Sequence, residues 1–277
     1  MTAGILLPLT AGIILIAGCV TIPAPIERNA AADRVAAAGG FERSRTISGP
    51  FTLTSYQRIK NPGAPVNIYI EGDGISWITE WRLSDDPTPR EPLVLELASA
   101  DPAENVVYLA RPGQYCAGGP DCPAEYWSGR RFSKAAVDAM DRAIDEIRQK
   151  SGAKEIGLIG YSGGAAIAAI IAARRNDVKS LRTIAGNLDT DAVNRYHRVS
   201  ALSEDSLNPI DDAPKLASLP QRHYVGSRDT VIPAFIARKF ASAAGDSRFD
   251  SVTIVEGAGH TKGWRERWQE LLAMRLK

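Results

Sequence analysis

The hydrophobic pattern alternates between short apolar runs and longer segments with helical spacing. The short runs predict buried strands at 66–70, 105–110, 156–159, 181–185, 223–225 and 251–255. Helical spacing predicts helices over 92–100, 133–150 and 264–275. Residues 44–59 alternate around a Ser-Gly-Pro turn, which predicts an antiparallel hairpin. Regular structure therefore runs from about residue 44 to the last helix.

One predicted strand passes directly into an Ala- and Ile-rich helix. The turn between them reads Gly160-Tyr161-Ser162-Gly163-Gly164. Glycines on both sides of the serine remove side chains that would collide, and the turn pushes the Ser162 hydroxyl outward. The N–H groups at the start of the helix favour negative charge at the same point. The alternative is a glycine-rich turn whose serine only caps the helix.

This turn resembles the nucleophile elbow of the α/β-hydrolase superfamily, the esterase- and lipase-like serine hydrolases. The resemblance covers nearly all of residues 44–277 and implies an α/β fold with a mostly parallel central sheet and helices on both faces. It also implies a triad in the chain order Ser162, Asp229, His260, each directly after a predicted strand. His223 lies within a predicted strand and His197 precedes the acid, so His260 is the preferred base.

The strand at 66–70 runs into Glu71-Gly72-Asp73-Gly74. Many α/β-hydrolases have His-Gly here, in a loop that supplies one backbone N–H to the oxyanion hole. The resemblance implies the backbone N–H groups of Asp73 and Gly163 as the donors. The Asp73 carboxylate must then point away or be paired. An ordinary turn is the alternative.

Loops at the carboxyl ends of strands suggest where a substrate pocket lies. Its candidate residues are Gly74, Gln114, Tyr161 and His197, although local hydrogen bonding is the favoured role for His197. Residues 187–220 lack a long periodic run, which predicts a small cap or none and an open site. Cys116 and Cys122 lie in a turn-rich loop and predict one local disulfide, with two free thiols as the alternative.

The first residues predict export. The apolar run 5–16 is too short to span a bilayer comfortably, and Ile16-Ala17-Gly18-Cys19 resembles the lipobox of bacterial lipoproteins. The resemblance implies removal of residues 1–18, lipid attachment at Cys19, and a tether over 19–43. We expect anchoring to the cell envelope at the outer membrane, on its periplasmic or surface side. A plain secretory signal is the alternative.

The balance of charged residues limits the classes of binding partner. Lys and Arg number 33 against 32 Asp and Glu, so no strong field selects nucleic acid. We expect one domain, a monomer, with no metal and no organic cofactor. The predicted function is hydrolysis of a small-molecule ester or other acyl substrate through an acyl-enzyme. The alternatives are a thioesterase or peptidase of the same fold, and a non-catalytic envelope lipoprotein that uses the fold as a binding scaffold.

Overall fold

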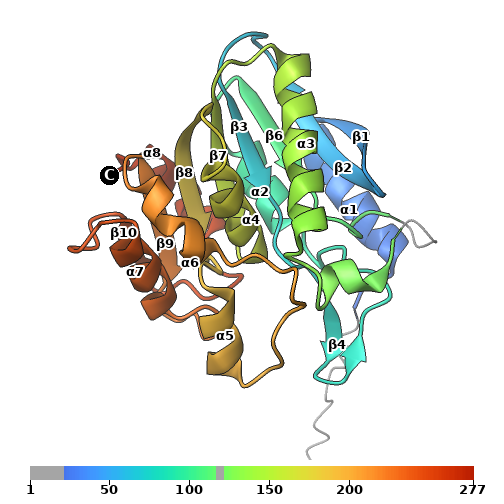
Figure 1. The fold of residues 1–277 in the computed structure, drawn as a ribbon. Helices are drawn as coiled ribbons and strands as arrows, with labels where there is room; N and C mark the ends of the chain where they lie inside the picture. Colours follow the sequence, from blue (N-terminus) through green and yellow to red (C-terminus); the bar gives the residue numbers. More distant parts are fainter. Residues whose placement is uncertain (1–21, 117–121) are drawn as a thin grey trace, which may run out of the picture.

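A computed structural model describes residues 22–116 and 122–277 (Figure 1). Its centre is an eight-stranded sheet in the order β1-β2-β6-β3-β7-β8-β9-β10. The strands are β1 (Glu42–Ser48), β2 (Phe51–Ile59), β3 (Val66–Ile70), β6 (Asn105–Leu109), β7 (Ile156–Tyr161), β8 (Val178–Ile184), β9 (Gln221–Gly226) and β10 (Val252–Val255). All neighbours from β6 to β10 are parallel, and β1 and β2 are antiparallel additions. The predicted fold class is therefore confirmed.

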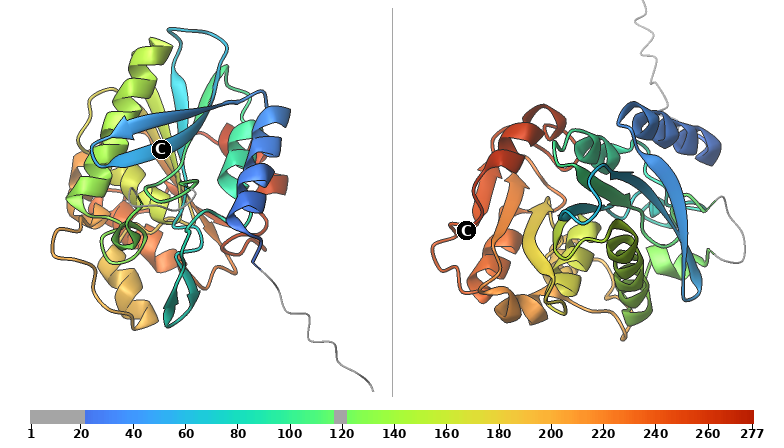
Figure 2. Two further views of the ribbon diagram at one scale, coloured as in Figure 1. Left: turned by 90° about the vertical axis from the view of Figure 1, so that its right-hand side faces the viewer. Right: turned by 90° about the horizontal axis from the view of Figure 1, so that it is seen from above.

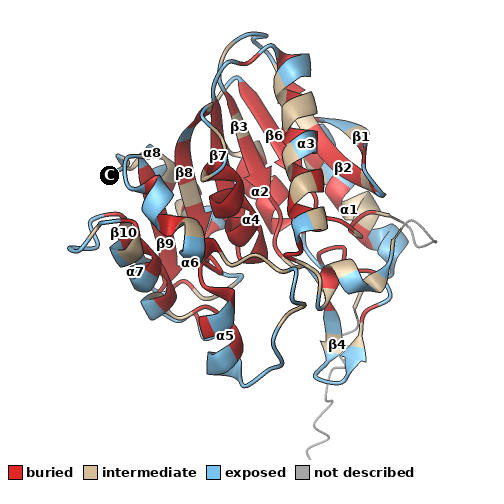
Figure 3. Cartoon of the chain, in the orientation of Figure 1, coloured by how far each residue is buried: buried red, intermediate tan, exposed pale blue. Residues whose placement is uncertain are grey.

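Helices cover both faces of the sheet (Figure 2). One core contains α3 (Lys134–Ser151), α4 (Gly163–Ala172) and α7 (Ala234–Ala243), and the other contains α1 (Pro25–Ala38), α2 (Leu93–Ser99) and α8 (Trp268–Ala273). Because helices cover both faces, the central strands are buried along their whole length, as Figure 3 shows. The parallel strands all end at one edge of the sheet, which we call the carboxyl edge.

Helix α1 corrects the predicted boundary between tether and domain. Ala32 and Ala36 on α1 are buried in the core formed with α2. The Arg28 side chain, also buried, donates to the carbonyl oxygens of Asp86 and Thr88. The domain therefore includes α1, although the tether was predicted to extend to residue 43. Small alanines let the helix approach the domain closely, so the composition that suggested a tether is here the composition of a packed helix.

Most predicted elements are present, with small shifts at their ends. The closing helix predicted over 264–275 is a 3₁₀ turn at Arg265–Arg267 followed by α8. Helix α7 and the hairpin of β4 (Trp77–Thr79) and β5 (Arg82–Leu83) were not predicted. Residues 187–220 form α5 (Thr190–His197), α6 (Pro209–Asp212) and a 3₁₀ turn at Ala213–Leu216. Short segments such as these carry too little periodicity to be recognised in a sequence.

The predicted signal segment and Cys19 lie outside the described residues. Within residues 22–116 and 122–277, no helix has the length and apolar character needed to cross a membrane.

Candidate active site

Ser162 occupies the turn between β7 and α4, at the carboxyl edge. Its backbone has φ 50° and ψ −119°, a conformation that non-glycine residues seldom adopt. A Cβ atom on Gly160 would overlap the backbone of Ala165, and one on Gly164 would overlap the carbonyl oxygens of Ile70 and Glu71. The two glycines are therefore required for strand and helix to meet so tightly, which is what the sequence pattern predicted.

Three predicted residues from distant parts of the chain form one hydrogen-bonded series. His260 Nε2 lies 3.1 Å from the Ser162 Oγ, and His260 Nδ1 lies 2.9 Å from Asp229 Oδ2. The other Asp229 oxygen accepts hydrogen bonds from the backbone N–H groups of Val231 (2.8 Å) and Ile232 (2.9 Å). The Asp229 side chain is fully buried. Its carboxylate is therefore held rigidly behind the imidazole.

The two other histidines have different partners. His223 lies in β9, where its ring bonds to the hydroxyl of Thr183 and the side chain of Gln221. Burial lowers the pKa of His223 to about 4, so its ring is neutral at pH 7. His197 ends α5 and bonds through Nε2 to the carbonyl oxygen of Val231 at 2.7 Å. Val231 lies 34 residues further along the chain, so this bond joins two distant segments, whereas the sequence favoured a local hydrogen bond for His197.

The Asp73 loop lies against the first residue of α4. A Cβ atom on Gly163 would overlap both the Asp73 carboxylate and the Arg111 guanidinium, so only glycine permits this approach. Among the described residues, the backbone N–H groups of Asp73 and Gly163 donate no hydrogen bond. Two free donors beside a serine hydroxyl match what a developing oxyanion needs.

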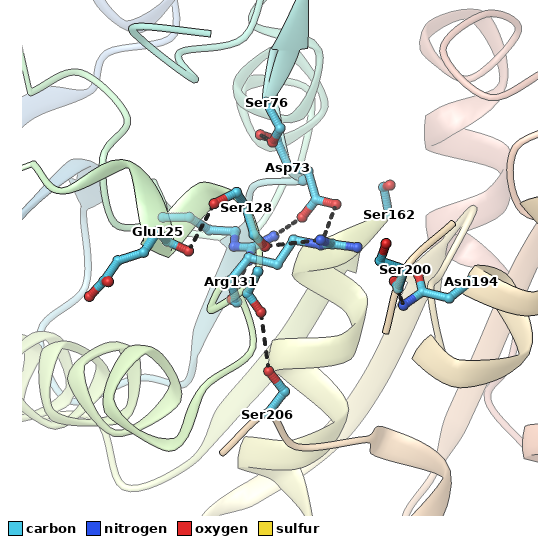
Figure 4. Close-up of polar contacts among 12 residues, drawn as sticks. Asp73, Ser76, Glu125, Ser128, Arg131, Ser162, Asn194, Ser200 and Ser206 are labelled. Atoms are coloured by element: carbon cyan, nitrogen blue, oxygen red, sulfur yellow. Dashed lines mark hydrogen bonds and ion pairs between the residues drawn. The ribbon is translucent and has the colours of Figure 1, made fainter. Parts of the chain in front are cut away.

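The Asp73 carboxylate is paired with two arginines. One oxygen forms an ion pair with Arg111 Nη1, and the other lies 3.5 Å from Arg131 Nε. Figure 4 shows Asp73 with Arg131 beside Ser162. Burial acts to raise the Asp73 pKa, but the charges of Arg111 and Arg131 outweigh it and hold the pKa below its ordinary value. The carboxylate is therefore ionised, and the two arginines balance its charge. The sequence left open whether it pointed away or was paired, and the structure shows it paired.

A protein-family model matches this chain. The family model described as serine hydrolase (FSH1) matches residues 103–261, more than half of the chain. This chain belongs to the FSH1 serine hydrolase family. Comparison with the curated proteins finds no match.

Solved structures show the same fold at low sequence identity. TT1662 from Thermus thermophilus is 17% identical with a TM-score of 0.57, over 84% of this chain and 95% of its own. The Pyrococcus furiosus esterase Pf2001 is 14% identical with a TM-score of 0.59, over 85% and 92%. The Pyrococcus horikoshii acylaminoacyl peptidase is 16% identical with a TM-score of 0.60, over 86% of this chain but 41% of the peptidase. At these identities the likeness establishes the fold alone.

Three residues of this serine hydrolase that were predicted to line the pocket contact the backbone of the loops around the site. The Gln114 side chain accepts from the Arg111 backbone N–H and donates to the carbonyl oxygen of Gly72, both at 2.9 Å. Gly74 has φ 64°, and a Cβ there would overlap the carbonyl of Pro87. The Tyr161 hydroxyl donates to the His260 carbonyl oxygen at 3.0 Å. All three residues therefore position the loops that carry the reactive groups.

A small cavity of about 10 Å³ lies beside Asp73 and reaches Arg111, Gln114 and Trp127, but its lining does not include Ser162. That volume is about what one water molecule needs. This cavity is therefore too small to hold an acyl substrate.

Glu71, which begins the Glu71-Gly72-Asp73-Gly74 loop, is buried behind Asp73. It accepts from the backbone N–H of Gly72 at 2.8 Å and from the Tyr108 hydroxyl at 3.0 Å. Burial raises the pKa of Glu71 to about 7. The sequence gave no signal for the tyrosine partner of Glu71 or for Arg131, which precedes α3 and is far from the Asp73 loop in sequence.

Two further predictions concern the cysteines and metals. The structure joins the sulfur atoms of Cys116 and Cys122, whose Cα atoms are 6.5 Å apart, within the range of disulfides. Among the described residues, no cluster of three or more His, Cys, Asp or Glu has a metal-binding arrangement.

Proposed function

We propose that this serine hydrolase cleaves carboxylic esters through an acyl-enzyme on Ser162. His260 acts as the general base and Asp229 orients and stabilises its ring. The observation that carries the proposal is the hydrogen-bonded series from Asp229 through His260 to Ser162 at the strained turn. A capping serine would not require a histidine on its hydroxyl and a buried carboxylate behind that histidine.

In the first half-reaction, Ser162 Oγ bonds to the ester carbonyl carbon while His260 Nε2 takes the hydroxyl proton. The carbonyl electron pair moves to the oxygen, which is stabilised by the backbone N–H groups of Asp73 and Gly163. When the C–O bond to the leaving group breaks, the alkoxide takes the proton from His260. In the second half-reaction water repeats these steps, with His260 as base, and releases the acid and free Ser162.

The first experiment compares Ser162→Ala with Ser218→Ala, an exposed serine between the 3₁₀ turn at Ala213–Leu216 and β9. Both variants are assayed with a short p-nitrophenyl ester and with a fluorophosphonate probe. Ser162→Ala should lose hydrolysis and labelling, whereas Ser218→Ala keeps both. If Ser162→Ala retained both, the assignment would be wrong. If the wild-type chain showed neither, the binding-scaffold alternative would be favoured.

The substrate class is tested with matched ester, thioester and amide substrates that share one acyl group. Esters should have the largest kcat/KM. A larger kcat/KM for the amide or the thioester would make the protein a peptidase or a thioesterase instead.

We further propose that the chain is exported and lipid-anchored at Cys19, with a disulfide between Cys116 and Cys122. The lipobox-like sequence supports the anchor, and the cysteine separation supports the disulfide. Metabolic labelling with a palmitate analogue should mark the wild type and not Cys19→Ser. Label that survives in Cys19→Ser would refute the anchor. Peptide mapping without reduction tests the disulfide.

A further inference from the structure

The exposed large hydrophobic side chains of this chain are distributed unevenly. Ten are exposed among the described residues, and seven of these belong to segments around the carboxyl edge, where Ser162 lies. Single exposed apolar residues need no explanation, but a concentration on one face marks an interaction site. The seven form two groups, one on each side of the site.

The first group, the hairpin corner, consists of Trp77, Trp81 and Ile26. Trp81 is 90% exposed and Trp77 is 49% exposed, both on the β4–β5 hairpin that follows the Asp73 loop. Figure 1 shows this hairpin projecting beyond the carboxyl edge. Ile26, 78% exposed, lies in the first turn of α1. Arg28 joins that turn to the segment after the hairpin through the carbonyl oxygens of Asp86 and Thr88.

The second group, the helix corner, consists of Tyr196, Val199, Val231 and Phe235, all exposed. Tyr196 and Val199 lie at the end of α5, whereas Val231 and Phe235 follow the Asp229 turn. The rings of Tyr196 and Phe235 are 6.0 Å apart, and these two segments are also joined by the bond between His197 and the Val231 carbonyl. In Figure 1, α5 and β4 project beyond the same edge of the sheet, the carboxyl edge.

The chemistry of both corners suits a lipid surface. Tryptophan and tyrosine combine an apolar ring with a polar group, and they prefer the headgroup region of a bilayer. At the helix corner, Arg195 and Arg198 are exposed on either side of Tyr196, and residues 195–200 contain no acid. Basic residues interleaved with aromatic ones attract anionic lipids. At the hairpin corner, Glu80 and Arg82 have opposite charges, and Glu27 and Asp85 are also exposed, so this corner has no basic excess and its contact with lipid depends on the tryptophan rings.

We propose that the carboxyl edge docks on the headgroup region of an anionic lipid bilayer, with the hairpin corner and the helix corner as its two contacts. Ser162 then faces the bilayer between them. This proposal rests on the proposed function only in its consequence, which is that the enzyme takes its ester from the lipid surface. Docking itself does not depend on hydrolysis.

The length of the chain before α1 agrees with this orientation. Cys19 precedes Ala24, the residue before α1, by five residues. A fully extended chain of that length spans at most about 18 Å. Lipid attached at Cys19 would therefore hold the first turn of α1 close to the bilayer. That turn lies at the hairpin corner, and Figure 2 shows the start of α1 and the hairpin on the same side of the domain.

Quenching of tryptophan fluorescence by brominated lipid tests the proposal. The full chain is reconstituted into vesicles of phosphatidylethanolamine and phosphatidylglycerol in which part of the lipid is brominated. Trp127, Trp264 and Trp268 are buried, so lipid quenching reports Trp77 and Trp81. We expect quenching in the wild type and its loss in the double variant Trp77→Phe and Trp81→Phe. The Ser162→Ala variant should be quenched like the wild type, which separates docking from catalysis.

The matched control carries a tryptophan at the opposite edge of the sheet. Phe249 is exposed and lies three residues before β10, where its carbonyl oxygen accepts from the Val252 N–H, so it lies where the parallel strands begin. In the Trp77→Phe, Trp81→Phe background, Phe249→Trp should be quenched by aqueous iodide but not by brominated lipid. Replacing Arg195 and Arg198 by glutamine should weaken quenching of the native tryptophans and remove the difference between anionic and phosphatidylcholine vesicles.

Three outcomes would overturn the proposal. In the first, Trp77 and Trp81 are quenched by iodide and not by lipid, or the chain does not bind the vesicles. In the second, lipid quenches the tryptophan at 249 equally well, so that the protein has no preferred orientation. In the third, the native tryptophans are shielded from both quenchers because the chain self-associates, which would make a second copy the partner.

The consequence for catalysis has its own measurement. The double Trp→Phe variant should hydrolyse a short soluble ester at the wild-type rate and hydrolyse an ester embedded in the vesicles more slowly. Equal loss on both substrates would indicate damage to the site. No loss on the embedded ester, with lipid quenching intact in the wild type, would refute delivery of the ester from the bilayer.

Discussion

Asp73 and Asp229 occupy corresponding places in two parts of the fold. Each lies three residues after a parallel strand, β3 or β9, at the edge that carries Ser162. Asp229 is fully buried and faces His260 and two backbone N–H groups. Asp73 is 28% exposed and faces Arg111 and Arg131. The same side chain therefore has chemically different partners, because an imidazole can accept or release a proton and a guanidinium cannot.

The Asp→Asn substitution should therefore act on different properties at the two positions, on the rate at Asp229 and on stability at Asp73. Asp229→Asn should lower kcat/KM for a p-nitrophenyl ester by roughly a thousandfold or more. The asparagine oxygen can still accept from Val231 and Ile232, but its amide would donate to His260 Nδ1. The ring would then carry its proton on Nε2 and could not accept the Ser162 proton. Little change in rate would show that Asp229 is only structural.

Asp73→Asn should act mainly on stability. It leaves Arg111 buried without its counter-charge, and breaking a buried pair costs roughly 3–5 kcal/mol of unfolding free energy. The rate should stay within about tenfold of wild type because the proposed oxyanion donor is the backbone N–H, which the substitution keeps. Urea unfolding and kcat/KM are measured on one preparation. A large loss of rate without a loss of stability would contradict the comparison.

A double-mutant cycle sharpens the same prediction. Adding Arg111→Met to Asp73→Asn removes both members of the pair, so the combined loss of stability should be smaller than the sum of the single losses. Additive losses would show that the two side chains do not interact.

Glu71 adds a third carboxylate, which differs from both because it lacks a cationic partner in hydrogen-bond contact. Its pKa is about 7 in the folded protein, above the ordinary value of 4.5. Between pH 4.5 and about 7 the folded state binds a proton that the unfolded state has lost. The contribution of Glu71 to stability is therefore fully present below pH 4.5 and is lost as the pH rises through about 7. Glu71→Gln should remove this loss, which amounts to at most roughly 3 kcal/mol.

The measurement is the unfolding free energy of wild type and Glu71→Gln across pH 4 to 8, a range chosen to bracket the two pKa values. The difference between the proteins should favour the variant increasingly toward high pH. A difference that does not change with pH would show that Glu71 does not titrate in this window.

His197 should matter least. It is exposed and its ring makes one hydrogen bond, to the carbonyl of Val231 beside the Asp229 turn. His197→Ala should change stability by about 0.5 kcal/mol or less and leave kcat/KM on a soluble ester unchanged. A large fall in kcat/KM would place His197 in the substrate site and extend the catalytic side of the comparison.

The amino-acid sequence alone determined the central strands, the longest helix and the turn that carries Ser162. Buried parallel strands read as continuous apolar runs, so β3, β6 and β7 were located closely, and the glycines around Ser162 marked the turn because only they fit there. The order Ser162, Asp229, His260 was implied by the resemblance to the α/β-hydrolases, in which each of these residues follows a strand.

Only the tertiary structure determined which charged side chains form ion pairs. Arg111 and Arg131 reach Asp73 from the segments after β6 and before α3, and no local pattern predicts a contact over such separations. The packing of α1 and the projection of the tryptophan hairpin were likewise invisible in the sequence. Local spacing specifies a helix or strand through backbone geometry, whereas pairing and exposure depend on which distant surfaces the folded chain brings together.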